Sequence, residues 1–281
     1  MLCDIMYSEE YKDVMTKLRG FLEQKTYTEE ALALTEKALE LLAAHYTTWH
    51  YRFNIVKAIK RDLFEELDWC ELVALENEKN YQIWHYRQLI IEEILKDEEL
   101  ASKFDFHREY PILSEMLQED SKNHHVWSYR KWFVERFSLH EAIEELQFVE
   151  SMLDADLRNN SAWTHRFYLK FGLEDWQKNV DSEIEYAKSK IEICPQNPSS
   201  WNYLKGIYRK SNRDIRELRE FCTPLADVKA KEIKSSFALE LMAEIEKAAG
   251  DKDLAAAYYT QLAEVYDPIR ANYWNYVKNM L

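Results

Sequence analysis

Apolar side chains recur along this chain at steps of three and four residues, which is the spacing of one face of an α-helix. Upstream of Trp127, for example, Tyr110, Leu113 and Leu117 follow this spacing. A second apolar stretch begins near the tryptophan itself, and a polar break follows it. The pattern predicts a pair of helices, the second of which begins near the tryptophan.

The predicted pair recurs along the chain. Five tryptophans in similar short blocks are separated by 35, 43, 36 and 38 residues, and a sixth follows the fifth after 73 residues. That last distance is close to two periods, and Phe237 stands near its midpoint. We therefore expect about seven tandem repeats, centred on Trp49, Trp84, Trp127, Trp163, Trp201, Phe237 and Trp274.

A single helix pair cannot cover its own apolar face, so neighbouring pairs must stack into a solenoid. The expected fold is all-α, a right-handed α-α superhelix that forms one crescent-shaped domain over residues 1–281. Its concave side would receive a partner. The widest spacing, before Trp127, contains an extra polar segment at residues 96–106, which we expect to be a surface loop.

Two polar residues keep fixed places around the tryptophan. An asparagine four residues before it is expected to cap the second helix, at Asn80, Asn123, Asn159 and Asn197. An arginine three residues after it is expected to pair with acidic side chains or helix-end carbonyls of the adjoining repeat, at Arg52, Arg87, Arg130 and Arg166. The many remaining Glu and Asp residues are assigned to solvated helix faces.

Composition supports a helical protein, because only 4 glycines and 5 prolines occur in 281 residues. A formal net charge of -14 argues against nucleic-acid binding, which requires clustered cations. No apolar run is long enough to span a membrane, and Met1 is not followed by a basic region and an apolar run, so we expect a cytoplasmic protein without membrane insertion. The cysteines lie far apart and are expected to be reduced and mostly packed, at Cys3, Cys70, Cys194 and Cys222.

No metal site is expected in this chain. Adjacent histidines on a helix, such as His124 and His125, point about 100° apart, and no H-E-x-x-H arrangement occurs. One charge pattern does stand out, because a cation lies five residues before the tryptophan in three consecutive repeats, at Lys79, Lys122 and Arg158. These cations could bind an anion along one edge of the solenoid, or they could form a solvated row.

The repeated block N-x-x-x-W-x-x-R resembles the α-subunit repeat of the protein prenyltransferases, and the resemblance extends from about Tyr27 to Leu281. The segments EKNYQIWHYR and DSKNHHVWSYRKW look like the second and third repeats of the subunit that farnesyltransferase and geranylgeranyltransferase type I share. NNSAWTHR and NPSSWNYLKGIYR look like its fourth and fifth repeats. The order of these blocks matches the family.

The resemblance implies an enzyme subunit that is active only with a separate β subunit. The heterodimer would transfer farnesyl or geranylgeranyl from an isoprenoid diphosphate to the cysteine thiol of a C-terminal CaaX motif, in substrates such as small GTPases. The β subunit would hold the catalytic Zn²⁺, and Mg²⁺ is expected with the diphosphate.

The resemblance also implies roles for residues of the second repeat. Lys79 matches the lysine that reaches the isoprenoid diphosphate, where a cation stabilises the negative charge that grows as the bond to carbon breaks. Tyr81 matches a tyrosine beside that site, and Gln82 matches a glutamine that hydrogen-bonds the CaaX carboxylate. Asn80 lies between Lys79 and Tyr81 in the same predicted substrate-binding group.

In the third repeat, Asn123 and His125 match residues that line the same face, and Lys122 lies beside them. His124 departs from the family pattern, which usually has tyrosine there, so a diphosphate contact from this position would require a protonated histidine to replace the hydroxyl.

Two other functions are compatible with a helical repeat array. The α subunit of Rab geranylgeranyltransferase has related repeats and requires an escort protein. A non-catalytic tetratricopeptide-like scaffold would hold a peptide, but its stricter period of about 34 residues and the lack of this block disfavour it.

Overall fold

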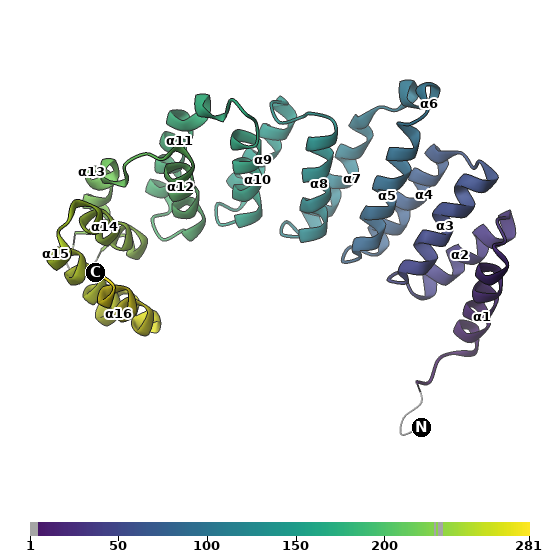
Figure 1. Ribbon diagram of the computed structural model, residues 1–281, viewed down its shortest axis with the longest axis horizontal. Coiled ribbons are helices and arrows are strands. Elements are labelled where there is room, and N and C mark those ends of the chain that lie inside the picture. Colours follow the sequence, from purple (N-terminus) through teal and green to yellow (C-terminus); the bar gives the residue numbers. More distant parts are fainter. Residues whose placement is uncertain (1–4, 228, 230–232) are drawn as a thin grey trace. The chain divides into compact units, whose positions relative to one another are not determined.

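The computed structural model describes residues 5–227, 229 and 233–281, and its contacts divide the chain into two compact units. The N-terminal unit is Met1–Phe137 and the C-terminal unit is Ser138–Leu281. All regular secondary structure of the described residues is helical (Figure 1). The predicted all-α class is confirmed, and Cys3 lies outside the described residues.

The N-terminal unit begins with α1 (Glu9–Gln24), which packs against the first of three helix pairs. The pairs are α2 (Glu29–Leu41) with α3 (Tyr46–Ile59), α4 (Leu63–Glu76) with α5 (Tyr81–Ile94), and α7 (Glu109–Glu119) with α8 (His124–Arg136). The second helices α3, α5 and α8 pack against one another in succession, and the first helices α4 and α7 are also in contact (Figure 1).

The segment expected to be a surface loop before α7 is mostly exposed, but part of it is helical. It contains α6 (Glu98–Lys103) and a 3-10 turn, Phe106–Arg108. Asp97 starts α6 because its carboxylate accepts the backbone N–H groups of Glu99 and Leu100. The rings of Phe104 and Phe106 lie 5.8 and 5.5 Å from that of Phe137 and attach the segment to the unit.

The C-terminal unit continues the helix pairs. Its first two are α9 (Ile143–Ala155) with α10 (Asn160–Phe171) and, after a 3-10 turn at Trp176–Asn179, α11 (Val180–Ile193) with α12 (Pro198–Ser211). In the described residues, the sixth repeat has short helical pieces, Ile215–Leu218, α13 (Arg219–Cys222) and Thr223–Leu225, before its second helix α14 (Ser236–Ala249). The last pair is α15 (Lys252–Gln261) with α16 (Ala271–Asn279). A π-helical segment, Leu262–Tyr266, and a 3-10 turn, Pro268–Arg270, join them.

The sixth repeat therefore departs from the expected helix pair. Pro224 lies in the segment where its first helix would run, and proline lacks the N–H that a continuous helix requires. Phe237 stands at the start of α14 and is partly exposed, whereas Trp274 in α16 is buried. The sixth repeat is degenerate in its backbone as well as in its central residue.

The tryptophans connect the core to the turns between paired helices. Each of the first five lies four residues into its second helix and is at most 7% exposed. In four of them the indole N–H donates to the carbonyl six residues earlier, at 2.7–3.0 Å, from Trp49 to Ala43, Trp127 to Ser121, Trp163 to Leu157 and Trp201 to Pro195. One side chain thus fills the space between two helices and also fixes the turn that joins them.

The buried thiols agree with the expected packing of the cysteines. Cys70 and Cys222 are buried, and burial raises the pKa of each thiol to about 12, while Cys194 is partly exposed. In the part of the chain that the structure describes, no helix combines the length and apolar character needed to cross a membrane.

Candidate functional site

The second repeat places Lys79 at the start of a helix. Asn80 caps α5, because its side-chain oxygen accepts the backbone N–H groups of Gln82 at 2.8 Å and Ile83 at 3.4 Å. Lys79 directly precedes this cap and is exposed. The unpaired N–H groups and the dipole of a helix N-terminus favour anions, and the lysine ammonium adds a full positive charge there.

The third repeat repeats this arrangement. Asn123 caps α8 by accepting the N–H groups of His125 at 3.0 Å and Val126 at 3.4 Å. The Nδ2 of the same side chain donates to the carbonyl of Glu78 at 2.8 Å, across 45 residues of sequence. Asn123 is almost fully buried, so this bond holds the N-terminus of α8 beside the turn that bears Lys79.

Side chains of the two repeats meet at this junction. The ammonium of Lys79 pairs with the carboxylate of Asp120, whose other oxygen accepts the backbone N–H of Lys122 at 3.1 Å. The rings of Tyr81 and His125 lie 5.9 Å apart. Lys79, Tyr81, Lys122 and His125 therefore lie together at the junction of these two repeats.

The charges at this surface reinforce each other. The hydrogen bond and the charge of Asp120 raise the pKa of Lys79. The hydrogen bond from Lys79, then the N–H of Lys122, lowers the pKa of Asp120. In the free chain the exposed ammonium of Lys79 is thus in contact with a carboxylate.

The other predicted residues have different surroundings. His124 is exposed, and its ring lies 5.8 Å from that of His125. Gln82 is largely buried, and its Nε2 donates to the carbonyl of Ala44 at 2.9 Å, so it connects the second repeat to the turn of the first. Arg158 is exposed in the C-terminal unit, where its backbone N–H donates to Asp156.

A pocket opens next to Tyr81 and Gln82, between α3 and α5, with a volume of about 390 Å³. Its lining is largely aromatic and apolar, and consists of Tyr46, Trp49, His50, Tyr81, Gln82, His85, Tyr86 and Leu89. Tyr46 and Tyr81 are exposed at its edge. The second helices therefore present an apolar hollow directly beside the cationic helix start.

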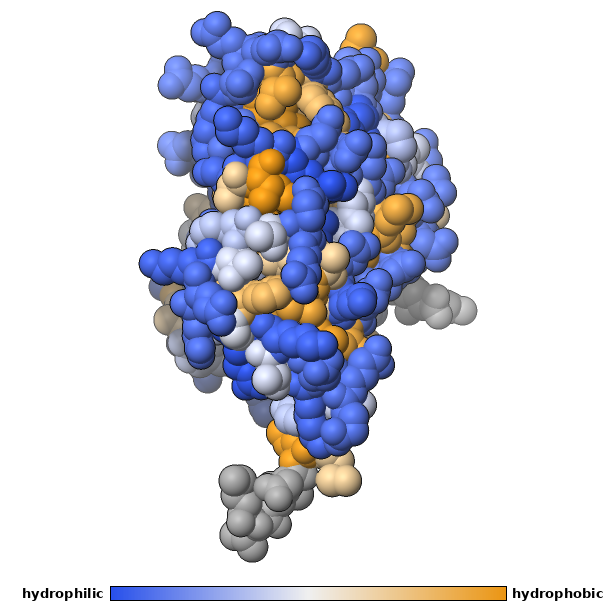
Figure 2. All heavy atoms as spheres, turned by 90° about the vertical axis from the view of Figure 1, so that its right-hand side faces the viewer, coloured by the Kyte–Doolittle hydropathy of each residue, from blue (hydrophilic) through white to orange (hydrophobic). Residues whose placement is uncertain are grey.

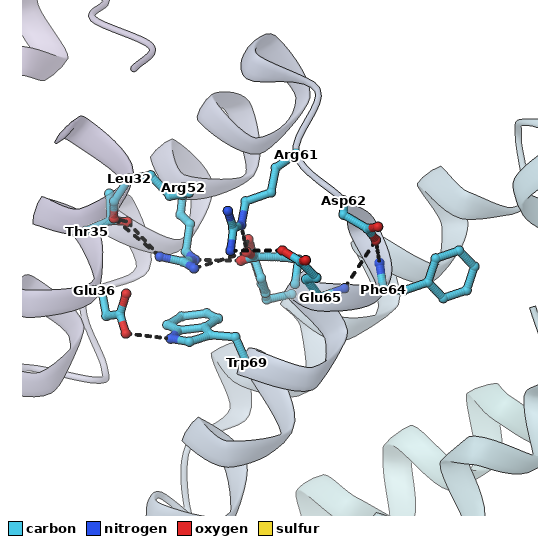
Figure 3. A network of polar contacts seen from close by, with 11 residues as sticks. Leu32, Thr35, Glu36, Arg52, Arg61, Asp62, Phe64, Glu65 and Trp69 are labelled. Atoms are coloured by element: carbon cyan, nitrogen blue, oxygen red, sulfur yellow. Dashed lines mark hydrogen bonds and ion pairs between the residues drawn. The ribbon is translucent and has the colours of Figure 1, made fainter. Parts of the chain in front are cut away.

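The arginines three residues after the tryptophans lie at the junctions between repeats. Arg52 of α3 forms a bidentate ion pair with Glu66 of α4, in which Nε and Nη2 lie 2.6 and 3.1 Å from the carboxylate oxygens. It also donates to Thr35, as Figure 3 shows, and its guanidinium stacks 3.4 Å from the ring of Trp69. Tyr86 of α5 donates to Glu66 at 2.6 Å. The predicted pairing of this arginine with the adjoining repeat is confirmed.

The same three-residue contact recurs, and we call it the junction triad. It consists of an arginine, the glutamate of the next repeat and the tyrosine two residues after the next tryptophan. The triads are Arg52–Glu66–Tyr86, Arg87–Glu109–Tyr129 and Arg166–Glu183–Tyr203. Burial, together with the glutamate charge, raises the pKa of each tyrosine well above its usual value.

These glutamates correct the assignment of Glu and Asp to solvated faces. Glu66, Glu109, Glu145 and Glu183 are all buried. Each lies 18 residues before a tryptophan, which is the sequence signal that identifies them. A buried carboxylate requires a partner, and in the triads the arginine and tyrosine supply it.

No group of three or more His, Cys, Asp and Glu side chains in the described residues could hold a metal ion. His45 instead bonds Thr48 at 2.7 Å, and His50 bonds Asn54 at 3.2 Å.

Comparison with known proteins identifies the repeat. A family model described as "Protein prenyltransferase alpha subunit repeat" matches residues 28–59, 63–94, 106–137, 143–169 and 180–211. The chain is 49% identical to a Candida albicans protein farnesyltransferase/geranylgeranyltransferase type-1 subunit alpha, over 98% of this chain and 90% of that protein. It is 32% identical to the subunit of that name from Dictyostelium discoideum, over 100% of this chain and 87% of that protein.

A solved structure is also similar. A chain of the Candida albicans protein geranylgeranyltransferase-I complexed with GGPP superimposes with a TM-score of 0.94 and 48% sequence identity, covering 99% of this chain and 93% of that chain.

Proposed function

Because the chain belongs to the family of protein farnesyltransferase/geranylgeranyltransferase type-1 alpha subunits, we propose that it is active as half of a heterodimer with a prenyltransferase β subunit. The heterodimer transfers farnesyl or geranylgeranyl from an isoprenoid diphosphate to the cysteine thiol of a C-terminal CaaX motif. The proposal includes a cytoplasmic location and one crescent-shaped domain, residues 1–281, that surrounds the β subunit.

The observation that carries the proposal is the place of Lys79. It lies at the capped N-terminus of α5, and Asn123 holds the N-terminus of α8 beside the same turn. We infer that the two helix N-termini, with Lys79 and Lys122 beside them, bind one anionic group. A diphosphate has the charge and the several oxygens that such a surface can bind.

In this mechanism Lys79 exchanges Asp120 for a diphosphate oxygen. Exposed ion pairs are weak, so breaking the contact between Lys79 and Asp120 costs little free energy. As the bond between carbon and the diphosphate oxygen breaks, negative charge grows on the departing group. The ammonium stabilises this charge more in the transition state than in the ground state, which lowers the barrier.

Tyr81 and Gln82 are assigned to the substrates. Tyr81 is exposed between Lys79 and the pocket of α3 and α5, where it can contact the diphosphate or the isoprenoid. Gln82 faces the same pocket, and its amide is proposed to hydrogen-bond the CaaX carboxylate. Asn80 and Asn123 contribute by orienting the two helix starts, while Lys122, His124 and His125 complete the polar surface.

We assign Zn²⁺ to the β subunit, where it would activate the substrate thiol as a thiolate, and Mg²⁺ to the diphosphate.

The test is co-expression with a farnesyltransferase β chain or a geranylgeranyltransferase type I β chain, followed by an assay with a short CaaX peptide. We expect each heterodimer to prenylate the peptide without an escort protein, and the chain alone to be inactive. A requirement for an escort would favour the Rab-type alternative, and failure of both β chains to co-purify would contradict the proposal.

The role of Lys79 has its own test in the same heterodimer. Lys79→Ala should lower the single-turnover rate by about 10- to 1000-fold, the range for loss of one charge-stabilising donor. Lys37→Ala, which removes an exposed lysine from α2, should leave the rate unchanged. An unaltered rate in Lys79→Ala would remove this residue from the mechanism.

A further inference from the structure

A second groove lies between the first helices α2 and α4, and the proposed reaction does not use it. Its volume is about 210 Å³, and it is lined by Glu36, Leu39, Glu40, Trp69, Leu72, Val73, Glu76 and Asn77. We call it the outer groove. The end of the molecule that bears α1 and α2 is mostly hydrophilic, with separate hydrophobic patches (Figure 2).

The floor of the outer groove is rigid and aromatic. The guanidinium of Arg52 stacks on Trp69, whose Nε1–H donates to Glu36 at 3.2 Å, and the rings of Trp49 and Trp69 lie 5.7 Å apart. Leu39 is buried beneath the groove, whereas Leu72 is 65% exposed. The indole is therefore held in place while an apolar side chain next to it remains uncovered.

The rim of the groove is acidic. Glu36, Glu40 and Glu76 supply three carboxylates, and Glu36 is already bonded to the indole of Trp69. Within the described ranges 5–227, 229 and 233–281, neither Glu40 nor Glu76 forms an ion pair. The groove thus combines an aromatic ring, an exposed leucine and two carboxylates that lack a cation.

The C-terminal unit shows what completes such a groove. At the same repeat positions, between α9 and α11, Tyr186 replaces Trp69, Asp154 replaces Glu40 and Lys190 replaces Val73. The ammonium of Lys190 pairs with Asp154 at 3.1 Å and lies 5.4 Å from the centre of the Tyr186 ring. Here the chain supplies its own cation to a carboxylate and an aromatic ring.

The outer groove has the carboxylate and the ring but not the lysine. It is also more acidic, because Glu76 stands where the C-terminal unit has Ile193, and its exposed leucine, Leu72, stands where that unit has Ser189. An ammonium or guanidinium between Glu40 and Trp69 would make the contacts that Lys190 makes, and an apolar side chain beside it would cover Leu72.

We propose that the outer groove is a docking site for a basic segment of a partner protein, in which a lysine or arginine is accompanied by an apolar side chain. The cation lies between Glu40 and Trp69, and the apolar side chain packs on Leu72. The site is separate from the surface around Lys79, so the proposal does not depend on the prenyl-transfer function.

The test uses a short fluorescein-labelled peptide of Lys-Leu pairs separated by alanine, with fluorescence anisotropy as the measurement. It is applied to the full chain and to its heterodimer with a β subunit. We expect saturable binding at physiological salt to both, and at least about tenfold weaker binding of the peptide in which Glu replaces Lys.

Two variants locate the binding. Val73→Lys installs the lysine that the C-terminal unit already has, so it should pair with Glu40 and weaken peptide binding by about tenfold. Ala257→Lys adds the same charge at an exposed position of α15 and should change binding by less than about twofold. Glu40→Gln removes the anion without added bulk, should also weaken binding, and keeps the test decisive if Val73→Lys fails to fold.

Three results would overturn the proposal. The first is equal binding of the peptide to wild type, Val73→Lys and Glu40→Gln, which would mean that the net charge of -14 alone accounts for the binding. The second is loss of peptide binding in the heterodimer, which would make the β subunit the occupant. The third is a self-association of the chain, measured by sedimentation, that Val73→Lys abolishes, which would make a second copy the occupant.

Discussion

At the scale of single residues, two of the capping asparagines, Asn123 and Asn197, each have two functions. Asn197 shows both within the C-terminal unit, because its oxygen accepts the N–H of Ser199 at 3.1 Å and its Nδ2 donates to the carbonyl of Leu157 at 2.7 Å. That carbonyl also accepts the indole N–H of Trp163 at 2.9 Å. One amide therefore caps a helix and connects successive repeats.

Substitution of Asn197 separates these functions. Asn197→Ala should lower the free energy of unfolding by about 1–3 kcal/mol, because it removes a cap and a buried hydrogen bond. Asn197→Asp keeps an acceptor for the cap but loses the donor to Leu157, and its carboxylate would face that carbonyl. Urea unfolding followed by circular dichroism measures the free energy of unfolding of both variants. Equal stability of Asn197→Ala and wild type would show that the amide contributes to neither contact.

The sequence predicts the caps but not the connections between repeats. Asparagine four residues before tryptophan is a local signal, and the caps at Asn80, Asn123, Asn159 and Asn197 are confirmed. The bond from Gln82 to Ala44 spans 38 residues, and no local rule requires it. The ion pair of Lys79 with Asp120 also joins residues that are far apart in the sequence, so it depends on how the repeats stack.

At the scale of helices, the junction triad is the main polar contact between successive repeats. Arg87 and Glu109 are fully buried and bond at 2.7 and 2.8 Å, and Arg87 also donates to the carbonyl of Leu67 at 2.9 Å. Burial alone would lower the pKa of Arg87, but the charge of Glu109, the Tyr129 hydroxyl and the hydrogen bond to Glu109 together outweigh it and raise that pKa. The guanidinium of Arg87 is therefore stabilised by its partners inside the protein.

A double-mutant cycle tests this pair. Arg87→Met alone should destabilise the chain by about 3–5 kcal/mol, because it leaves the Glu109 carboxylate buried without its counter-ion. Glu109→Met alone should cost a similar amount. The double variant should lose much less than the sum, since no uncompensated charge remains. Additive losses, measured by urea unfolding, would contradict a direct coupling.

The sequence predicts one half of this contact. The arginine attracts notice because it follows the tryptophan at a fixed distance, and its pairing with the next repeat is predicted correctly. The glutamate is hidden among 51 acidic residues, and only its place 18 residues before the tryptophan distinguishes it. Periodicity identifies the position, but burial shows that its carboxylate lies inside.

At the scale of the whole molecule, period and helix type are predictable, while local irregularity is not. The five regular repeats agree with the tryptophan spacing, and each second helix begins three residues before its tryptophan. The segment at residues 96–106 and the sixth repeat deviate, because Asp97 starts an extra helix and Pro224 interrupts an expected one. Such effects depend on individual caps and prolines rather than on the period.

The candidate surface around Lys79 also depends on this scale. The resemblance names its residues, and the fold brings Lys79, Tyr81, Lys122 and His125 together in the N-terminal unit. Their chemical roles require a second chain and two substrates, so they stay predictions that the heterodimer must test.

The junction triad has a consequence for how such a chain can change its length. The second and third repeats each carry a glutamate and a tyrosine that receive the arginine of the repeat before, and an arginine three residues after their own tryptophan. Removal of residues 63–105 would leave Arg52 facing Glu109 and Tyr129, which are the same partners in kind as Glu66 and Tyr86. Loss of a single helix would instead leave a buried charge without its partner. The chain can therefore gain or lose a whole repeat of this kind and keep its buried charges paired, whereas gain or loss of part of a repeat would leave one unpaired.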